Sequence, residues 1–217
     1  MMSDMSSSVF LVGCGGHGRV VLDALLSADV NNIRIIDPLL RVGTNCFGIP
    51  VVPEGELLDF PAKTSLLLVN GLGVTNSLVR RSEIATRYQN LGYQFRGVIH
   101  PIVHLGRETE VHATAQVLAG AILQNRVQLG EHTVVNTGAR VDHDCVVGAG
   151  SFVGPGAILS GGVVVEDQVL IGAGAVVLPG VKIARGARVG AGAVVVKDVD
   201  ADSTVVGCPA VALKNQT

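Results

Sequence analysis

One histidine lies between two carboxylates in the segment Val141-Asp142-His143-Asp144-Cys145-Val146. An imidazole titrates near neutral pH and a neighbouring carboxylate favours its protonated form, so His143 beside Asp144 could act as a general base. The alternative is a solvated histidine at a surface corner. Cys145 could be a nucleophile if its thiol is exposed, or inert packing if it points into a core. The chemistry of this segment therefore depends on where its side chains point.

Metal binding is a further use of histidine. A catalytic zinc ion needs three protein ligands. The nearest preceding histidines, His104, His112 and His132, stand at spacings that do not bring them to His143 in a regular repeat. We therefore expect no metal site.

A second group of chemistry-bearing residues lies near the amino terminus. The segment Gly13-Cys14-Gly15-Gly16-His17-Gly18 follows the apolar run 9–12, and Asp37 ends a second apolar run. Glycines allow a backbone to approach a phosphate at a helix N-terminus. The pattern predicts a nucleotide or nucleotide-sugar site, with loop amides on phosphate and Asp37 on a ribose or base; a structural tight turn and an NAD site remain alternatives. The segment Asn70-Gly71-Leu72-Gly73 is either part of that site or an ordinary strand-to-helix turn.

A six-residue period positions the residues of the second half of the chain. Every sixth residue from 105 to 194 is aliphatic, in fifteen blocks without an insertion: Leu105, Val111, Val117, Leu123, Leu129, Val135, Val141, Val147, Val153, Leu159, Val165, Ile171, Val177, Ile183 and Val189. This period fits neither a helical face nor a simple alternating strand. It is typical of a parallel β-helix whose coils each contain three hexapeptides.

The repeat assigns an orientation to each residue within it. Residues 18 apart stack, so Leu105, Leu123, Val141, Leu159 and Val177 form one inner ladder of five coils. Cys145 then points inward, where a thiol is inert packing, and His143 lies on a corner or the outer surface. Gly161 stacks above His143, which predicts open space beside the imidazole that could admit a thioester or an amine.

The residues before the repeat predict a separate α/β domain. Apolar runs at 9–12, 33–36 and 65–69 are read as strands, and 16–30 and 75–91 as helices. Strands alternating with helices indicate a small parallel βαβ sheet, half of a Rossmann-like fold. We expect a disordered tail at 1–8, a nucleotide-sugar-binding α/β domain at 9–95, a linker at 96–104, the β-helix at 105–194 and a C-terminal extension at 195–217.

Composition excludes several classes of protein. The formal net charge of −2 and the absence of a basic stripe argue against a nucleic-acid partner. The mean hydropathy is +0.48, yet no apolar run is long enough for membrane insertion, so we assign the excess to buried coils and a subunit interface. The four cysteines form no dense framework and the start of the chain does not resemble a secretory signal, which favours a cytoplasmic protein.

Taken together, these motifs resemble a known family. The hexapeptide frame, the His143-Asp144-Cys145 block, the glycine loop, Asp37 and the closing Gly207-Cys208-Pro209-Ala210 resemble the bacterial sugar-nucleotide acetyltransferases. These comprise the bacillosamine and perosamine N-acetyltransferases and the sialic acid O-acetyltransferases of glycan biosynthesis. The resemblance implies a left-handed parallel β-helix, a homotrimer with active sites between neighbouring prisms, acetyl-CoA along the coils, and an acceptor held partly by the amino-terminal domain.

The resemblance also implies roles for individual residues. His143 would be the catalytic base and Asp144 would increase its basicity. The cofactor acetyl-CoA and the nucleotide-sugar would then be bound by two further sets, namely Asn136, Phe152, Gly161, Ala173 and Ala191 for acetyl-CoA, and Gly15, Gly16, His17, Asp37, Pro38 and Gly73 for the nucleotide-sugar. Two departures stand out: several members have a histidine where this chain has Phe152, and members often have two acids where it has Asp37-Pro38.

The activity implied is acetyl transfer from acetyl-CoA to the amino group of a nucleotide-linked deoxy-amino-sugar, by direct attack without an acyl-enzyme. An alternative within the same chemistry is O-acetylation of a sialic acid or a similar sugar. An alternative of another class is a non-catalytic scaffold that binds a nucleotide-sugar.

Overall fold

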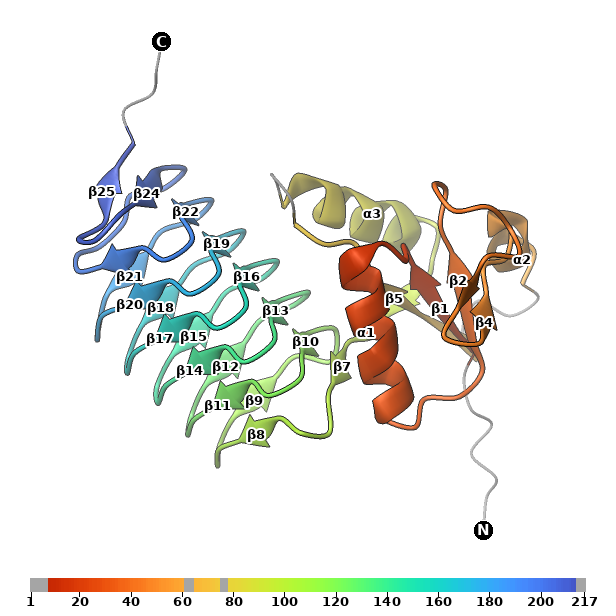
Figure 1. Cartoon of the computed structure of the whole chain (residues 1–217), viewed down its shortest axis with the longest axis horizontal. Coiled ribbons are helices and arrows are strands. Elements are labelled where there is room, and N and C mark those ends of the chain that lie inside the picture. The colour runs from red at the N-terminus through yellow and green to blue at the C-terminus, as the bar shows by residue number, and fades with distance from the viewer. Residues whose placement is uncertain (1–7, 61–64, 75–77, 214–217) are drawn as a thin grey trace. The chain divides into compact units, whose positions relative to one another are not determined.

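A computed structural model of the chain describes residues 8–60, 65–74 and 78–213 (Figure 1). The chain divides into two compact units, and the division falls between Val98 and Ile99. Each unit has its own hydrophobic core. The two are described separately below.

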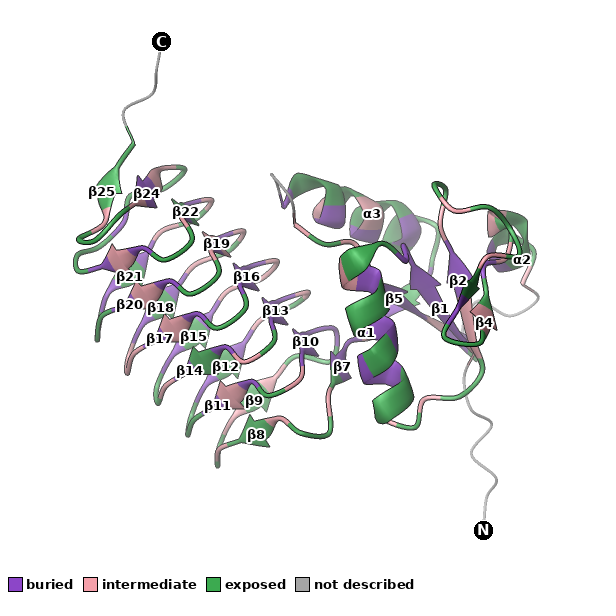
Figure 2. Cartoon of the chain, in the orientation of Figure 1, coloured by how far each residue is buried: buried purple, intermediate pink, exposed green. Residues whose placement is uncertain are grey.

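The amino-terminal unit is built on a four-stranded parallel sheet with the order β2-β1-β5-β6. Its strands are β1 (Ser8–Val12), β2 (Ile33–Ile36), β5 (Leu66–Asn70) and β6 (Gln94–Phe95). Helices α1 (Gly16–Ser27), α2 (Glu54–Leu58) and α3 (Val79–Asn90) and a small hairpin of β3 (Asn45–Cys46) and β4 (Ile49–Pro50) complete it. The central strand β1 is a buried apolar run, as expected of a parallel strand, whereas much of α1 is exposed (Figure 2).

The register of this sheet brings three loops to one edge. Val12, the last residue of β1, pairs with Ile36 of β2 and with Asn70 of β5. The glycine loop, Asp37 and the segment after Asn70 therefore all begin at the carboxyl edge, where open α/β sheets bind their ligands.

The predicted elements of this unit exist, with shifted ends. Helix α1 ends at Ser27 rather than at residue 30, because Asp29 adopts a left-handed backbone conformation with φ of 53°. Strand β5 lies one residue later than predicted, and helix α3 covers the later part of the predicted range 75–91. Residues 75–77 of that range and residues 1–7 of the predicted tail lie outside the described residues, while Ser8 already belongs to β1. The hairpin and α2 were not predicted, since neither shows an extended periodic pattern.

The second unit is a parallel β-helix with three flat faces (Figure 1). The first face contains β7 (Val98–Ile99), β10 (Gln116–Val117), β13 (Val134–Val135), β16 (Phe152–Val153), β19 (Leu170–Ile171), β22 (Arg188–Val189), β24 (Thr204–Val206) and the antiparallel β25 (Val211–Ala212). The second face contains β8 (His104–Leu105), β11 (Ile122–Leu123), β14 (Arg140–Val141), β17 (Ile158–Leu159), β20 (Val176–Val177) and β23 (Val194–Val195). The third face contains β9 (Glu110–Val111), β12 (Gln128–Leu129), β15 (Val146–Val147), β18 (Val164–Val165) and β21 (Lys182–Ile183).

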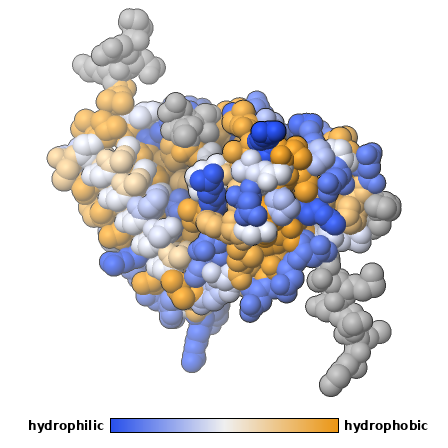
Figure 3. Space-filling model, turned by 45° about the vertical axis from the view of Figure 1, so that its right-hand side comes forward, coloured by the Kyte–Doolittle hydropathy of each residue, from blue (hydrophilic) through white to orange (hydrophobic). Residues whose placement is uncertain are grey.

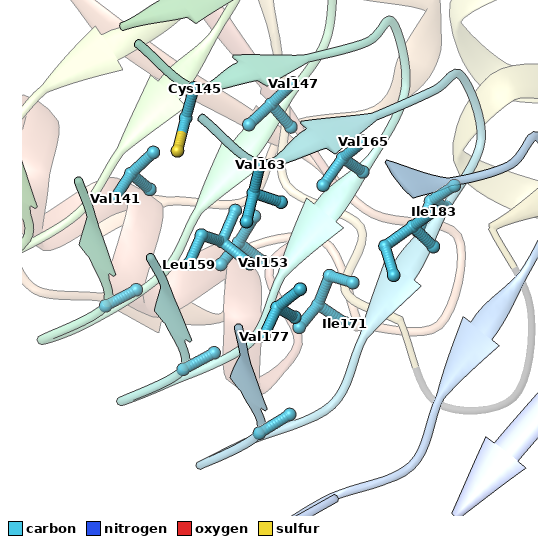
Figure 4. Packing of buried hydrophobic residues seen from close by; sticks show 14 of the residues in the cluster. Val141, Cys145, Val147, Val153, Leu159, Val163, Val165, Ile171, Val177 and Ile183 are labelled. Carbon is cyan, nitrogen blue, oxygen red and sulfur yellow. The ribbon is translucent and has the colours of Figure 1, made fainter. Parts of the chain in front are cut away.

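The hexapeptide frame is confirmed as the inner lining of this unit. The predicted ladder pairs in register from Leu105 through Leu123, Val141 and Leu159 to Val177. From Leu123 onward its residues are fully buried, whereas Leu105, at the open first coil, is 43% exposed. Figure 4 shows inward side chains of successive coils packed into one continuous core.

The winding extends beyond both ends of the predicted range 105–194. Strand β7 lies within the predicted linker 96–104 and joins the first face beside β10. Strand β24 lies within the predicted extension 195–217 and pairs in parallel with β22. The six-residue frame continues one block earlier into β7, since Ile99 lies six residues before Leu105, whereas β24 pairs 16 rather than 18 residues after β22 and departs from the frame. Both segments continue the backbone hydrogen bonds of the coils, so the β-helix has about six turns rather than five.

The outer surface carries aliphatic residues as well as polar ones (Figure 3). Along the second face the outward strand positions hold four partly exposed aliphatic residues, Ile122, Ile158, Val176 and Val194, together with His104 and Arg140. None of the helices in the described parts of the chain has the length and apolar character needed to cross a bilayer.

Candidate active site

His143 and Asp144 form a dyad on the corner that follows β14. The Nδ1 atom of His143 lies 2.7 Å from Oδ2 of Asp144. The backbone amide of His143 donates to Oδ1 of Asp142 at 2.8 Å, which fixes the turn. The histidine side chain is 61% exposed, so a ligand can reach the imidazole.

Arg126, on the preceding coil, holds the carboxylate of this dyad. Its Nε donates to Oδ1 of Asp144 at 2.6 Å, and its Nη2 lies 2.6 Å from the same oxygen. The hydrogen bonds from Arg126 and, second, from His143 lower the pKa of Asp144 to about 2. Sequence reasoning missed Arg126, although residues 126 and 144 are 18 apart and therefore stack.

The ionisation of Asp144 settles which imidazole nitrogen carries a proton. At neutral pH the Asp144 carboxylate has no proton to donate, because its pKa is about 2. The hydrogen between Nδ1 and Oδ2 therefore belongs to the imidazole. In the neutral ring, Nε2 then has a free lone pair, which is what a general base requires.

The predicted open space at Gly161 is filled by the imidazole itself. A Cβ atom at Gly161 would lie 2.6 Å from both Cε1 and Nε2 of His143, so the ring rests directly against the glycine backbone. The prediction of a gap there was wrong, because the His143 ring occupies the space that a side chain at Gly161 would take. Open room lies one residue on, at Gly162, where a Cβ would meet nothing within 4 Å.

Cys145 points into the core, as the repeat predicts. Its side chain is fully buried, its thiol donates to the carbonyl of Ser160 at 3.1 Å, and Figure 4 shows it among aliphatic side chains of the interior. Burial raises the pKa of the thiol to about 11. The geometry therefore gives Cys145 a packing role rather than a nucleophilic one.

Four of the five residues expected to bind acetyl-CoA lie away from His143, in the first face or at the corner that follows it, and Gly161 is the exception. Asn136, Ala173 and Ala191 follow strands β13, β19 and β22 of the first face, and Phe152 belongs to β16 of that face. The second face separates this corner from that of His143 and Gly161. Within one chain the structure therefore does not bring these four residues to the His143 corner. Phe152 is 7% exposed and Asn136 8%, while Ala173 and Ala191 are exposed.

At the carboxyl edge of the amino-terminal sheet, three glycines allow backbone to pack on backbone. A Cβ at Gly18 would lie 2.3 Å from the carbonyl oxygen of Gly13, and one at Gly71 would lie 2.0 Å from the same oxygen. Gly18 and Gly71 therefore bring α1 and the segment after β5 close to the first loop. Gly15 and Gly16, in contrast, are exposed at the start of α1.

Asp37 joins the loops that follow β1 and β2. Its Oδ2 accepts a hydrogen bond from the amide of Cys14 at 2.6 Å, and its Oδ1 accepts one from the amide of Leu39 at 2.8 Å. The amide of Gly13 donates to the carbonyl of Ile36 at 2.8 Å. The amides of Gly13 and Cys14, which were expected to bind phosphate, thus donate to protein oxygens instead. These hydrogen bonds join the glycine loop to the end of β2.

A pocket of about 230 Å³ opens at this edge, and Gly15, Asp37, Pro38 and Gly73 all line it. The structure therefore brings four of the six predicted nucleotide-sugar residues together. His17 lies beside Gly73, since a Cβ on that glycine would be 2.8 Å from the histidine Cβ, and Gly16 does not line the pocket.

Two further cations and one acid border this region. Arg80, in the first turn of α3, lines the same pocket. A second pocket of about 280 Å³ shares Asp37 and Pro38 and adds Glu54 and Arg87, which form an ion pair at 2.8 Å. Sequence reasoning missed these side chains, although Arg80 opens the helix that follows the Gly73 segment. Across the described residues, no three His, Cys, Asp or Glu side chains are grouped as a metal ion would require.

Comparison with known families identifies both units. Residues 8–85 match the PglD N-terminal domain, and residues 162–197 match the bacterial transferase hexapeptide of six repeats. A comparison with curated proteins gave no match.

Several solved structures resemble the chain over almost its whole length. PerB from Caulobacter crescentus, solved with CoA and GDP-perosamine, is 31% identical, with a TM-score of 0.85 and coverage of 95% of this chain and 97% of that one. The acetyltransferase domain of PglB from Neisseria gonorrhoeae is 30% identical, with a TM-score of 0.87 and coverage of 95% and 100%, and it has also been solved with acetyl coenzyme A. WeeI from Acinetobacter baumannii is 28% identical, with a TM-score of 0.85 and coverage of 95% and 99%. The chain belongs to this family of acetyl-CoA-dependent sugar N-acetyltransferases, which join a PglD-type amino-terminal domain to a hexapeptide-repeat β-helix.

Proposed function

We propose that the protein transfers the acetyl group of acetyl-CoA to the amino group of a nucleotide-linked deoxy-amino-sugar, with His143 as general base. The observation that carries this proposal is the oriented dyad. Nδ1 of His143 is bound to an ionised carboxylate, and Nε2 is left with a lone pair on an exposed ring.

The reaction needs one base and no covalent enzyme intermediate. The sugar amine attacks the thioester carbonyl carbon, and Nε2 of His143 removes a proton from the nitrogen as the C–N bond forms. The resulting tetrahedral oxyanion collapses, the C–S bond breaks, and the departing CoA thiolate takes the proton back from the imidazolium. The products are the N-acetylated sugar and free CoA thiol. Cys145, buried and with a raised pKa, supports a mechanism without an acyl-enzyme.

We further infer that the amino-terminal pocket holds the nucleotide part of the acceptor. Its size, the Arg80 side chain and the exposed glycines at the start of α1 suit a phosphate-bearing ligand. The remaining lone pairs of Asp37 are free to accept from a ribose or base. The complex of the Caulobacter relative with GDP-perosamine supports an acceptor of this class.

A homotrimer with active sites between neighbouring β-helices would complete the site. The second face separates the His143 corner from the corner of Asn136, Ala173 and Ala191, so in such a trimer each acetyl-CoA would meet the His143 corner of one copy and the other corner of its neighbour. The aliphatic outward row of the second face supplies an apolar surface suited to another copy. We expect the enzyme to act in the cytoplasm, since its four cysteines form no dense framework. Its mass in solution, measured by light scattering, tests the assembly: a monomer would refute it.

The activity is tested by release of CoA thiol from acetyl-CoA, screened against UDP-, GDP- and dTDP-linked amino-sugars and against free sialic acid. Release with a nucleotide-linked amino-sugar supports the proposal. Release with sialic acid alone would assign O-acetylation of a hydroxyl, and binding of nucleotide-sugars without thiol release would assign a non-catalytic scaffold.

The role of His143 is tested with His143→Ala, for which we expect kcat to fall by about 10² to 10⁴-fold while acetyl-CoA still binds. His104→Ala is the matched control, because His104 is an exposed histidine on β8, two coils before the dyad. An unchanged rate in His143→Ala would refute the assigned base.

A further inference from the structure

A ladder of charged corner residues lies beneath the catalytic histidine. Glu108, Arg126 and Asp144 are spaced 18 residues apart and share a left-handed backbone, with φ of 59°, 58° and 60°. The corners are joined by backbone as well, since the amide of Arg126 donates to the carbonyl of Arg107 at 3.0 Å and that of Asp144 to Asn125 at 3.0 Å. The same turn geometry on successive coils therefore stacks a carboxylate, a guanidinium and a second carboxylate in one column.

The contacts of Arg126 fix the rotation of the Asp144 carboxylate. Nε and Nη2 both approach Oδ1, so the planar guanidinium holds one carboxylate oxygen at two points. The second oxygen, Oδ2, is thereby directed to Nδ1 of His143. Glu108, on the opposite side of Arg126 in the column, adds electrostatic attraction that favours the charged guanidinium.

The competing interpretation is an ordinary surface ion pair. The side chains of Arg126 and Asp144 are 61% and 40% exposed, and pairs of this kind contribute little to folding. A contribution limited to folding stability would leave turnover unchanged. A contribution to the orientation of His143 would change turnover and leave stability almost unchanged.

We propose that Arg126 is a positioning residue for acetyl transfer, which acts through Asp144 on the tautomer and direction of His143. This inference rests on the proposed function of His143. It requires no contact between Arg126 and either substrate.

The test uses Arg126→Met, which keeps the length of the side chain and removes its charge and donors. We expect kcat for thiol release to fall by about tenfold to a hundredfold, by analogy with the outer-shell partners that orient histidine ligands in metal sites. The KM for acetyl-CoA and the melting temperature should remain close to the wild-type values. The acceptor is whichever of the UDP-, GDP- and dTDP-linked amino-sugars gives the fastest release. Arg126→Lys, which retains the charge but not the planar two-point contact, should lose less activity than Arg126→Met.

Lys182→Met is the matched control. Lys182 pairs with Glu166 at 2.6 Å, and the two side chains are 54% and 34% exposed. The substitution therefore removes an ion pair of similar length and exposure elsewhere in the β-helix. This variant should turn over normally. A loss equal to that of Arg126→Met would show that any surface pair of the coils affects the rate, and would overturn the proposal.

A double-mutant cycle separates positioning from direct binding. If Arg126 acts only through His143, adding Arg126→Met to His143→Ala should cause no further loss. A further loss in that background, or a raised KM for acetyl-CoA, would show that Arg126 contacts the cofactor instead. A normal rate in Arg126→Met with an impaired His143→Ala would refute the positioning role alone, whereas a normal rate in His143→Ala would refute the proposed base.

Discussion

Replacement of Gly161 by alanine tests the position of the His143 imidazole, which we propose as the general base. The added Cβ would lie 2.6 Å from Cε1 and Nε2 of His143, about 0.8 Å closer than the 3.4 Å at which ordinary contact begins. Gly161 has no left-handed backbone conformation, so alanine itself introduces no backbone strain. The exposed ring is the group that can give way.

Displacement of the His143 ring should change the stability of the fold little and lower the rate of acetyl transfer strongly. If the ring moves by close to 1 Å, Nε2 leaves its position or the 2.7 Å contact with Asp144 is lost. A misplacement of about 1 Å can cost about 10²-fold in rate, equivalent to about 2.7 kcal/mol of transition-state stabilisation. We therefore expect Gly161→Ala to lower kcat by about 10²-fold with a nearly unchanged melting temperature.

The assay is thiol release at saturating co-substrates, with Gly55→Ala as control. Gly55 lies in α2, and a Cβ there would meet only Oδ2 of Asp59, at 3.9 Å. Full activity of Gly161→Ala, together with an inactive His143→Ala, would refute the packing of the ring on Gly161.

Two further predictions concern the residues on either side of this corner. Because the pKa of Asp144 is lowered from an ordinary value near 3.8 to about 2, its ionised form stabilises the folded state above that ordinary value, and the contribution is lost as the pH falls toward 2. Asp144→Asn should therefore lower the midpoint of urea unfolding at pH 7 by only a small amount, because the pair is exposed, and the difference from wild type should disappear as the pH falls through about 2; an equal difference at pH 7 and below pH 2 would contradict the ion pair. Cys145→Ala should keep kcat within about twofold while costing about 1 kcal/mol of stability by urea titration, as for a typical buried truncation; loss of turnover in a folded variant would reinstate the thiol as a nucleophile.

The β-helix could be predicted because its core repeats. One aliphatic residue every six positions is enough to fix the pairing of Leu105 with Leu123 and of Val141 with Leu159, since residues 18 apart must stack. At the first end the same rule reaches further than the predicted range, because Ile99 in β7 lies six residues before Leu105 and 18 before Val117. At the other end the rule fails, because β24 pairs 16 rather than 18 residues after β22.

The gathering of the candidate nucleotide-sugar residues at one sheet edge was predictable, and their contacts were less so. The loops after β1, β2 and β5 meet because parallel strands share a carboxyl edge, and so Gly15, Asp37 and Gly73 line one pocket. That Asp37 uses both oxygens on backbone amides depends on loop conformations that the sequence pattern does not encode.

The contacts of His143 show which features of this corner the 18-residue stacking rule predicts and which it does not. The 18-residue rule correctly pairs Gly161 with the coil of His143, yet the absence of a side chain does not mean empty space: the nearest flexible group, the imidazole, fills it. The same rule applied one residue later pairs Asp144 with Arg126 below and with Gly162 above. The column that contains Asp144 therefore has charged side chains on the coils below it and glycines on the coils above it. A Cβ at Gly162 or Gly180 would meet nothing within 4 Å. A base that is fixed from one side and open on the other can be rigid and still accept a substrate, which is the combination that proton transfer from an incoming amine requires.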